Sequence, residues 1–118
     1  MYHKNKGFEY EKIAEKYLLE NNFAIKYKNF FCRLGEIDII AEKDGITHFI
    51  EVKGRINTRY GYPREAVTPY KQRRIISAAK YYLMQIGRDD IFCQFDVVEI
   101  IQEENSINIL ENAFWLSS

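Results

Sequence analysis

The stretch 36–53, EIDIIAEKDGITHFIEVK, decides the fold of this chain. Two runs rich in β-branched residues flank the dipeptide Asp44-Gly45. An Asp-Gly pair is typical of a two-residue hairpin turn, because both of its positions must accept a positive φ. We therefore predict two antiparallel strands, Glu36–Glu42 and Ile46–Lys53, joined at this turn.

A two-residue turn also fixes the pairing of the two strands. Ile39 then faces Ile50, and Asp38 faces Glu51; further out, Ile37 faces Val52 and Glu36 faces Lys53. Directly opposed residues share a face of the hairpin and successive residues alternate. One face carries Ile37, Ile39, Ile50 and Val52, and the other carries Glu36, Asp38, Glu51 and Lys53, together with Ile40 and Phe49. A bulge or a longer turn would shift this register by one residue.

The charged face of the hairpin suggests a chemistry. Opposed carboxylates with Cβ atoms roughly 4.5–5.5 Å apart repel each other, and a divalent cation such as Mg²⁺ would resolve the conflict. Lys53 beside them could orient a water molecule or stabilise charge on a phosphate, as phosphodiester hydrolysis requires. From spacing alone, an ordinary solvated face with a Glu36–Lys53 surface ion pair is an equal alternative. The unfavourable apposition of Asp38 and Glu51 argues against it.

The remaining chain supplies the other elements of one domain spanning residues 1–118. Apolar residues at helical spacing predict a first helix over about 7–20, and Thr68-Pro69 predicts the start of a second helix that ends before Gly87. Strands are predicted at Phe23–Phe31, Phe92–Ile101 and Ser106–Leu110, and a loop at Gly54–Pro63. The order α-β-β-β-α-β-β predicts an α/β fold with one sheet.

Composition narrows the class of protein. The chain of 118 residues is 47% hydrophobic, which is enough for one globular core. We expect no membrane partner, because no apolar stretch is long enough to span a bilayer and no leader is visible. We also expect no small-molecule cofactor. Cys32 and Cys93 are far apart and predict neither zinc nor a disulfide, so a reducing cytoplasm is expected. His3 and His48 are isolated, and we interpret them as surface or packing residues.

Basic residues concentrate in one segment although the net charge is 0. From Lys53 to Arg74 the segment has seven bases against the single acid Glu65. Such a patch can bind phosphate, although a solvated loop and helix face explains the charge run equally well. Tyr60 and Tyr62 could stack on unpaired bases, with packing as the alternative. The residues predicted to contact a nucleic-acid backbone are Arg55, Arg59, Arg64, Lys71 and Arg74.

Several motifs, in this order along the chain, also match a known family. They are Glu11-x-x-Ala14-x-x-Tyr17-Leu18, Gly35-Glu36-Ile37-Asp38-Ile39-Ile40-Ala41, Phe49-Ile50-Glu51-Val52-Lys53-x-Arg55, Gly61-x-Pro63-x-Glu65-Ala66-Val67, Lys71, and Phe95-Asp96-Val97-Val98. With them the chain resembles the PD-(D/E)XK nuclease superfamily, and more closely the YraN-type family of bacterial proteins, predicted to be endonuclease-like and distantly similar to archaeal Holliday junction resolvases. The resemblance implies a restriction-endonuclease-like αβββαβ core, a single mixed sheet flanked by helices. Two positions depart from the family pattern: Tyr10 where Gly is frequent, and Ile37 where the superfamily has Pro.

The resemblance implies a role for each matching residue. Asp38 and Glu51 would be ligands of Mg²⁺ or Mn²⁺ with the Val52 carbonyl as a third, Lys53 would be the catalytic lysine, and Glu11 would be an acid that approaches the metal. Glu36 and Gln72 would support the site.

The expected activity is a deoxyribonuclease acting on branched, flapped or single-stranded DNA in repair or recombination. Symmetric cleavage of a junction would require a homodimer. The alternatives are a catalytically silent nucleic-acid-binding module of the same fold, serving a DNA-processing partner, and a scaffold whose acids bind nothing.

Overall fold

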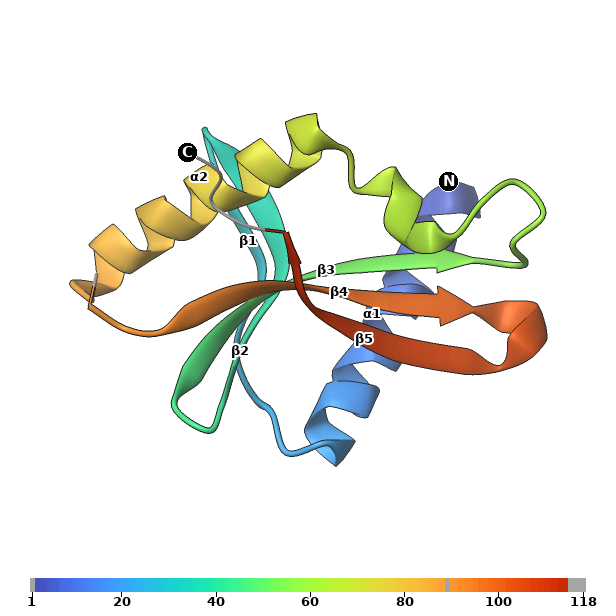
Figure 1. Ribbon diagram of the computed structural model, residues 1–118, viewed down its shortest axis with the longest axis horizontal. Coiled ribbons are helices and arrows are strands. Elements are labelled where there is room, and N and C mark those ends of the chain that lie inside the picture. Colours follow the sequence, from blue (N-terminus) through green and yellow to red (C-terminus); the bar gives the residue numbers. More distant parts are fainter. Residues whose placement is uncertain (1, 89, 115–118) are drawn as a thin grey trace.

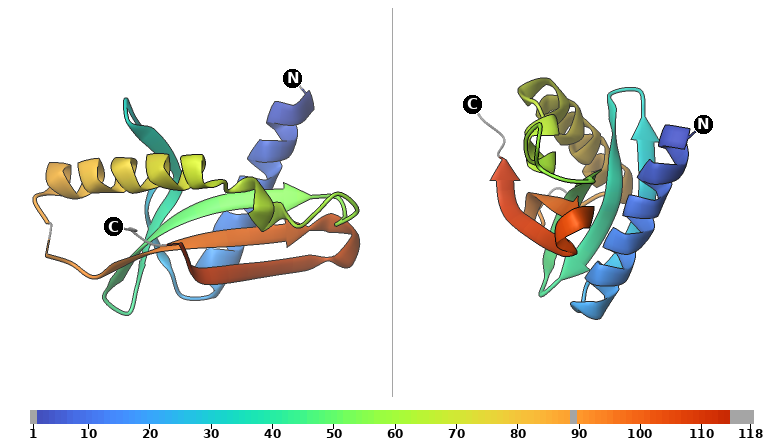
Figure 2. Two further views of the ribbon diagram at one scale, coloured as in Figure 1. Left: turned by 45° about the horizontal axis from the view of Figure 1, so that its top comes forward. Right: turned by 90° about the vertical axis from the view of Figure 1, so that its right-hand side faces the viewer.

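A computed structural model describes residues 2–88 and 90–114, with side chains from residue 9 onward. Helices α1 (Tyr2–Glu20) and α2 (Pro69–Ile86) cover opposite faces of one five-stranded sheet (Figures 1 and 2). The side chain of His3 lies outside the described residues. The strands and short 3₁₀ helices are β1 (Ala24–Cys32), β2 (Gly35–Lys43), β3 (Ile46–Arg55), η1 (Pro63–Ala66), β4 (Cys93–Ile101), η2 (Gln102–Glu104) and β5 (Ser106–Phe114).

The strands follow one another across the sheet in chain order, β1-β2-β3-β4-β5. Only β3 and β4 pair in parallel, because α2 carries the chain back across one face between them, while the other neighbours are antiparallel. The predicted α/β fold with a single mixed sheet flanked by helices is confirmed, and it is compatible with a restriction-endonuclease-like core. The predicted loop after Lys53 differs, since β3 continues to Arg55 and η1 begins at Pro63.

The residues predicted to form the turn and the helix ends have the backbone geometry that these features require. Asp44 and Gly45 both adopt positive φ, 53° and 78°, which confirms the hairpin turn. Thr68 caps α2 through its side-chain oxygen, which accepts a hydrogen bond from the Lys71 amide, and Gly87 ends the helix with φ 68°.

Two apolar clusters lie on the two sides of the sheet. Under α2, Ile75, Ala78 and Ala79 pack with Phe30, Ile37, Ile40, Phe49, Phe95 and Phe114. Under α1, Ala14 and Leu18 pack with Phe23, Ile39, Ala41, Ile50, Val52, Val98 and Ile100. Both helices therefore place apolar residues against the sheet, whereas Ile13 on α1 is 38% exposed.

The predicted hairpin register is confirmed for its inner half and wrong for its outer half. The β2–β3 ladder runs from Lys43↔Ile46 to Ile39↔Ile50 and ends there, before the expected pairs of Asp38, Ile37 and Glu36. The β1–β2 ribbon turns under α2 at this point (Figure 1), and Gly35 lies against the backbone of Arg74. Ile37 consequently packs in the cluster under α2, not with Ile39 under α1.

A buried polar network joins β3, β4 and β5. The carboxylate of Asp96 accepts hydrogen bonds from Gln94 and from the Asn112 amide, both at 3.0 Å, and its other oxygen lies 2.5 Å from His48 Nδ1. Asn112 has φ 53° and lies where the β4–β5 register shifts, so Asp96 holds an irregular turn of β5 in place. His48 is 3% exposed, which confirms packing as its role.

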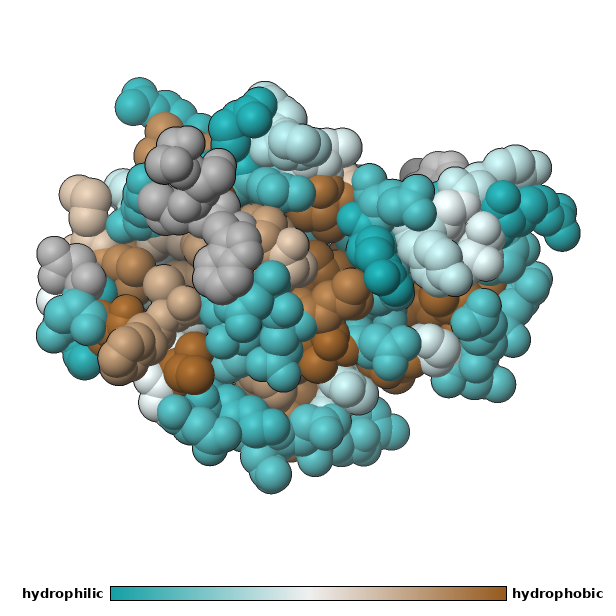
Figure 3. Space-filling view, viewed as in Figure 1, coloured by the Kyte–Doolittle hydropathy of each residue, from teal (hydrophilic) through white to brown (hydrophobic). Residues whose placement is uncertain are grey.

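Polar and apolar side chains alternate over the face shown in Figure 3. Among the side chains that the structure describes, the most exposed large apolar residues are Tyr60, Phe92, Met84 and Phe31. Neither helix, over the residues that the structure describes, has the length and apolarity to cross a membrane.

Candidate active site

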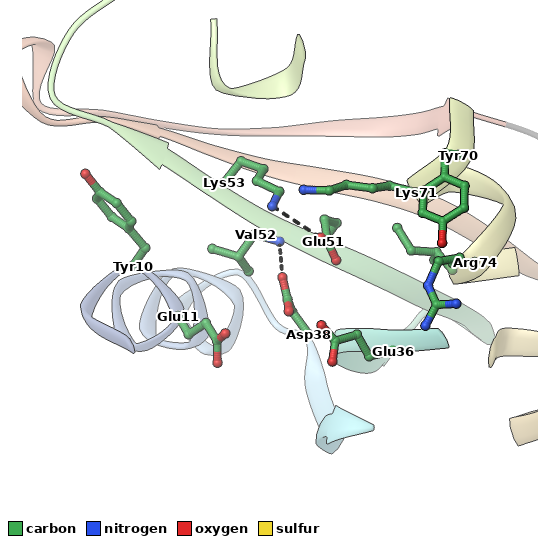
Figure 4. Close-up of a pocket in the computed structure, with 11 residues that line it drawn as sticks. Tyr10, Glu11, Glu36, Asp38, Glu51, Val52, Lys53, Tyr70, Lys71 and Arg74 are labelled. Carbon is green, nitrogen blue, oxygen red and sulfur yellow. Dashed lines mark hydrogen bonds and ion pairs between the residues drawn. The ribbon is translucent and has the colours of Figure 1, made fainter. Parts of the chain in front are cut away.

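A cavity of about 330 Å³ lies where both helices approach β2 and β3 (Figure 4). The ladder between these two strands has already ended here, and the strand ends separate to leave the space. The lining side chains come from four elements: Tyr10 and Glu11 from α1; Glu36 and Asp38 from β2; Glu51, Val52 and Lys53 from β3; Tyr70, Lys71, Arg74 and Ile75 from α2. The cavity therefore collects Glu11, Glu36, Asp38, Glu51, Lys53, Lys71 and Arg74 from the predicted set.

Asp38 and Glu51 form the acidic floor of the cavity. Asp38 Oδ2 accepts a hydrogen bond from the Val52 amide at 2.8 Å, and Glu51 Oε2 lies 3.6 Å from Lys53 Nζ. The Glu51 side chain is only 13% exposed. Burial, and next the negative charge of Asp38, raise the pKa of Glu51 to about 8 despite Lys53. Burial likewise raises the pKa of Asp38, which outweighs the hydrogen bond from Val52.

Two further carboxylates lie around this pair. Glu11 projects from α1 toward the cavity, and Glu36 lies beside Asp38 on β2 (Figure 4). The pKa of Glu11 is raised, first by burial and then by the charge of Asp38. The two carboxyl groups, one on α1 and one on β2, therefore interact electrostatically. The site thus concentrates more negative charge than Lys53 alone balances.

The opposite wall is basic and belongs to α2. Lys71 and Arg74 lie one turn apart on this helix, and the ammonium group of Lys71 points toward that of Lys53 (Figure 4). The charge of Lys53, and next burial, lower the pKa of Lys71. One cavity therefore has an acidic floor and a basic wall.

Not all predicted phosphate-contacting residues reach this cavity. The Arg64 guanidinium forms a two-pronged ion pair with the buried Glu99, at 2.9 Å for both contacts, which lowers the pKa of Glu99 through hydrogen bonding. Arg55 donates to the Tyr60 carbonyl at 3.3 Å, and Arg59 is exposed in the loop after β3. Gln72 is not among the lining residues, and its amide donates to the Val67 carbonyl at 3.0 Å.

Two tyrosines line the cavity that the sequence did not single out as site residues. Tyr10 precedes Glu11 and covers Gly54, where an added Cβ would lie 2.5 Å from its ring. Tyr70 lies in the first turn of α2, before Lys71. Their adjacency to predicted site residues was the only signal available. Tyr60 and Tyr62, for which the sequence left base stacking and packing as alternatives, do not line this cavity, and Arg64 lies over the ring of Tyr62.

The donor set fits a hard divalent cation. Carboxylate oxygens of Asp38 and Glu51 are the ligands that Mg²⁺ and Mn²⁺ prefer, with water and substrate phosphate completing the shell. Since the N–H and C=O of one strand residue point to the same side, the Val52 carbonyl faces the side where its amide meets Asp38. Over residues 9–88 and 90–114, no group of three or more His, Cys, Asp or Glu side chains is arranged so that it could hold a metal ion.

Comparison with known sequences identifies relatives along nearly the whole chain. The profile described as "Uncharacterised protein family UPF0102" matches residues 10–100. A UPF0102 protein of Lachnoclostridium phytofermentans is 46% identical over 113 residues, covering 94% of this chain and 93% of the relative. One from Clostridium perfringens is 45% identical with 96% of both chains covered, and one from Chlorobium phaeobacteroides is 47% identical, covering 80% of this chain and 75% of the relative. The chain belongs to the uncharacterised protein family UPF0102.

Proposed function

We propose that this domain is a Mg²⁺- or Mn²⁺-dependent nuclease that hydrolyses phosphodiester bonds in DNA. The observation that carries the proposal is the partly buried pair Asp38 and Glu51, with Lys53 beside it, at the floor of a cavity with a basic wall. Two carboxylates held together away from most of the solvent, with one lysine beside them, cost stability, and a binding module would have no use for them. The resemblance to PD-(D/E)XK nucleases supports the same function.

The residues of the site would have different roles in hydrolysis. Asp38, Glu51 and the Val52 carbonyl would hold the cation, with Glu11 approaching it from α1. The bound cation would lower the pKa of a water molecule and stabilise negative charge on the phosphate. Lys53 would donate a hydrogen bond to the attacking water and hold it in line with the phosphorus. The water oxygen bonds to phosphorus as the ester P–O bond breaks. One proton of the water is transferred to the leaving oxygen, which becomes the free hydroxyl end, and the remaining OH stays on the phosphate.

The charge around the cavity favours a polyanionic substrate. Lys71 and Arg74 on the wall, with Arg59 in the exposed loop after β3, would follow the sugar–phosphate backbone and make binding salt-sensitive. We propose that the substrate is branched, flapped or single-stranded DNA, because such DNA offers an unpaired strand that can enter the cavity. The proposed compartment is the cytoplasm, where Cys32 and Cys93, both unpaired, would remain reduced. Cutting both strands of a junction would need two copies of the chain.

A cleavage assay tests this proposal. The full chain is incubated with labelled single-stranded, flapped, four-way and duplex DNA in Mg²⁺, Mn²⁺ or EDTA. We expect cleavage of at least one substrate with a divalent cation, none in EDTA, and a loss of at least about 10²-fold in Glu51→Gln. Glu104→Gln is the matched control, because Glu104 is exposed in η2 and does not line the cavity.

The remaining outcomes separate the alternatives. Salt-sensitive DNA binding without any cleavage would favour the silent binding module. Equal cleavage by wild type and Glu51→Gln would show that the activity comes from another site or a contaminant.

A further inference from the structure

Lys53 and Lys71 place two like charges face to face in the cavity. They come from different elements, β3 and α2, and their ammonium groups point toward each other (Figure 4). An ammonium group donates hydrogen bonds and accepts none, so the two cannot satisfy each other. Glu51 lies 3.6 Å from Lys53, whereas Lys71 extends above it from the basic wall. The space between them suits an anionic oxygen.

The position of Lys71 within α2 is also unfavourable for a cation. The first six residues of this helix include Lys71, Arg73 and Arg74, and its first turn contains no acid. The N-terminal end of a helix carries partial positive charge, so bases there destabilise it. A sequence optimised for stability would have Asp or Glu at these positions. This arrangement is typical of a functional site, where binding is gained at the expense of stability.

We infer that Lys71 and Lys53 together form a phosphate subsite that binds one phosphoryl group from two sides, independently of any divalent cation. The inference deepens the proposed function and rests on it for the nature of the natural ligand, a nucleic-acid phosphate. The acidic floor and the basic wall then have different tasks. Asp38 and Glu51 would hold the cation, while Lys71 holds the phosphate against Lys53. The sequence predicted Lys71 as one of five residues that contact a nucleic-acid backbone, and the structure adds its position opposite Lys53.

Inorganic phosphate is the probe that tests the subsite. The unfolding midpoint of the full chain is measured in EDTA, over a range of phosphate concentrations at constant ionic strength, with sulfate-free buffer. Ligand binding to the folded state stabilises it by RT ln(1 + [L]/Kd), so the rise of the midpoint with phosphate concentration gives the Kd. We expect Lys71→Gln to weaken phosphate binding roughly ten- to a hundredfold, the usual effect of removing a charged hydrogen bond. Lys71→Arg should keep most of the affinity, and Lys80→Gln, on the exposed side of the same helix, should keep all of it.

The stability of the same variants gives an opposite readout. Without phosphate, Lys71→Gln should unfold at the same or a higher temperature than wild type, because it removes a cation from the helix start. A lysine with a structural role would instead lower the midpoint when removed. Equal phosphate affinity in wild type and Lys71→Gln, or no phosphate binding by wild type, would overturn the inference.

This test does not depend on turnover. A protein that cleaves DNA but whose Lys71→Gln variant binds phosphate normally would overturn only the subsite. A protein that binds phosphate through Lys71 but never cleaves DNA would overturn only the proposed nuclease.

Discussion

The Asp38 carboxylate on β2 accepts a hydrogen bond from the Val52 amide on β3, 2.8 Å away, where the backbone ladder between these strands ends. The Asp38 side chain thus accepts the hydrogen bond that a main-chain carbonyl of β2 would accept if the ladder continued. This contact fixes one carboxylate between Glu51 and Lys53, the two neighbours of Val52 in sequence. It lets β2 turn under α2 without leaving the Val52 amide unpaired, and so the fold and the acidic pair depend on the same bond.

The stability of the metal-free protein should fall as the pH rises from about 5 to 8. In the folded chain Glu51 keeps its proton up to a pKa of about 8, whereas an unperturbed glutamate has a pKa of 4.5. Between these values the folded state binds more protons than the unfolded state, so stability is fully present below the lower value and is lost toward the upper one. Urea unfolding in EDTA should show a loss on the order of a few kcal/mol across this range.

Glu51→Gln provides the control for this pH dependence. Its neutral amide cannot titrate, so the variant should unfold with a much flatter pH profile and should exceed wild type in stability at pH 8. If wild type and Glu51→Gln lose stability in parallel, the titrating group lies elsewhere.

Arg64 and Arg59 should differ in what their removal changes. Arg64 pairs with Glu99, which is 1% exposed, so Arg64→Ala leaves a buried carboxylate without its main partner and should cost about 1–3 kcal/mol of stability. Arg59 is exposed, so Arg59→Ala should leave stability unchanged and should weaken DNA binding, with a salt slope smaller by about 1. Denaturant unfolding and DNA titrations at several salt concentrations measure both effects. If Arg64→Ala instead weakened DNA binding and left stability unchanged, Arg64 would be a phosphate contact.

Asp96→Ala should be among the most destabilising polar substitutions in the chain. It removes the partner of His48 and of the Asn112 amide, together with one of the two partners of Gln94, and buried groups left without partners cost about 1–3 kcal/mol each. Denaturant unfolding should therefore show a loss of several kcal/mol. Glu111→Ala is the control, because its bond to Gln94 is exposed and should contribute little. Similar stability of the two variants would contradict a structural role for the network.

Gly35→Ala should destabilise the protein by at least about 1–3 kcal/mol, since an added Cβ would lie 2.2 Å from the Arg74 carbonyl oxygen. That neighbour is backbone, so no shortened side chain can make room. Gly54→Ala offers the contrast, because its Cβ would meet the Tyr10 ring, and Tyr10→Ala should relieve most of the clash. A double-mutant cycle measures the relief. A tolerated Gly35→Ala would show that β2 and α2 do not need this close approach.

Local signals predicted the elements of this fold well. The Asp44-Gly45 turn, the Thr68 cap and the Gly87 end each depend on a few neighbouring residues, so sequence alone defines them. The turn also fixed the register as far as Ile39 and Ile50. The ends of the strands were predicted less accurately. Strand β5 continues four residues beyond the predicted Leu110, through the irregular turn at Asn112.

Long-range relations were beyond the same reasoning. Periodicity could not show that the β2–β3 ladder would end at Ile39, because here β2 approaches α2 at Gly35 and Arg74, which are far apart in the chain. The Arg64–Glu99 pair joins residues 35 positions apart, and His48–Asp96 joins residues 48 apart. Glu11 was placed near the acidic pair only by resemblance to a family, since its spacing on α1 matches that of an ordinary exposed acid.

Mn²⁺ binding at the acidic pair tests the central claim most directly. A crystal of the full chain soaked in Mn²⁺ at about pH 8, where Glu51 can ionise, is measured at the manganese absorption edge. The account predicts one anomalous peak within about 2.0–2.4 Å of carboxylate oxygens from both Asp38 and Glu51, and no peak in crystals of Glu51→Gln. An empty pair in wild-type crystals at saturating Mn²⁺ would contradict it.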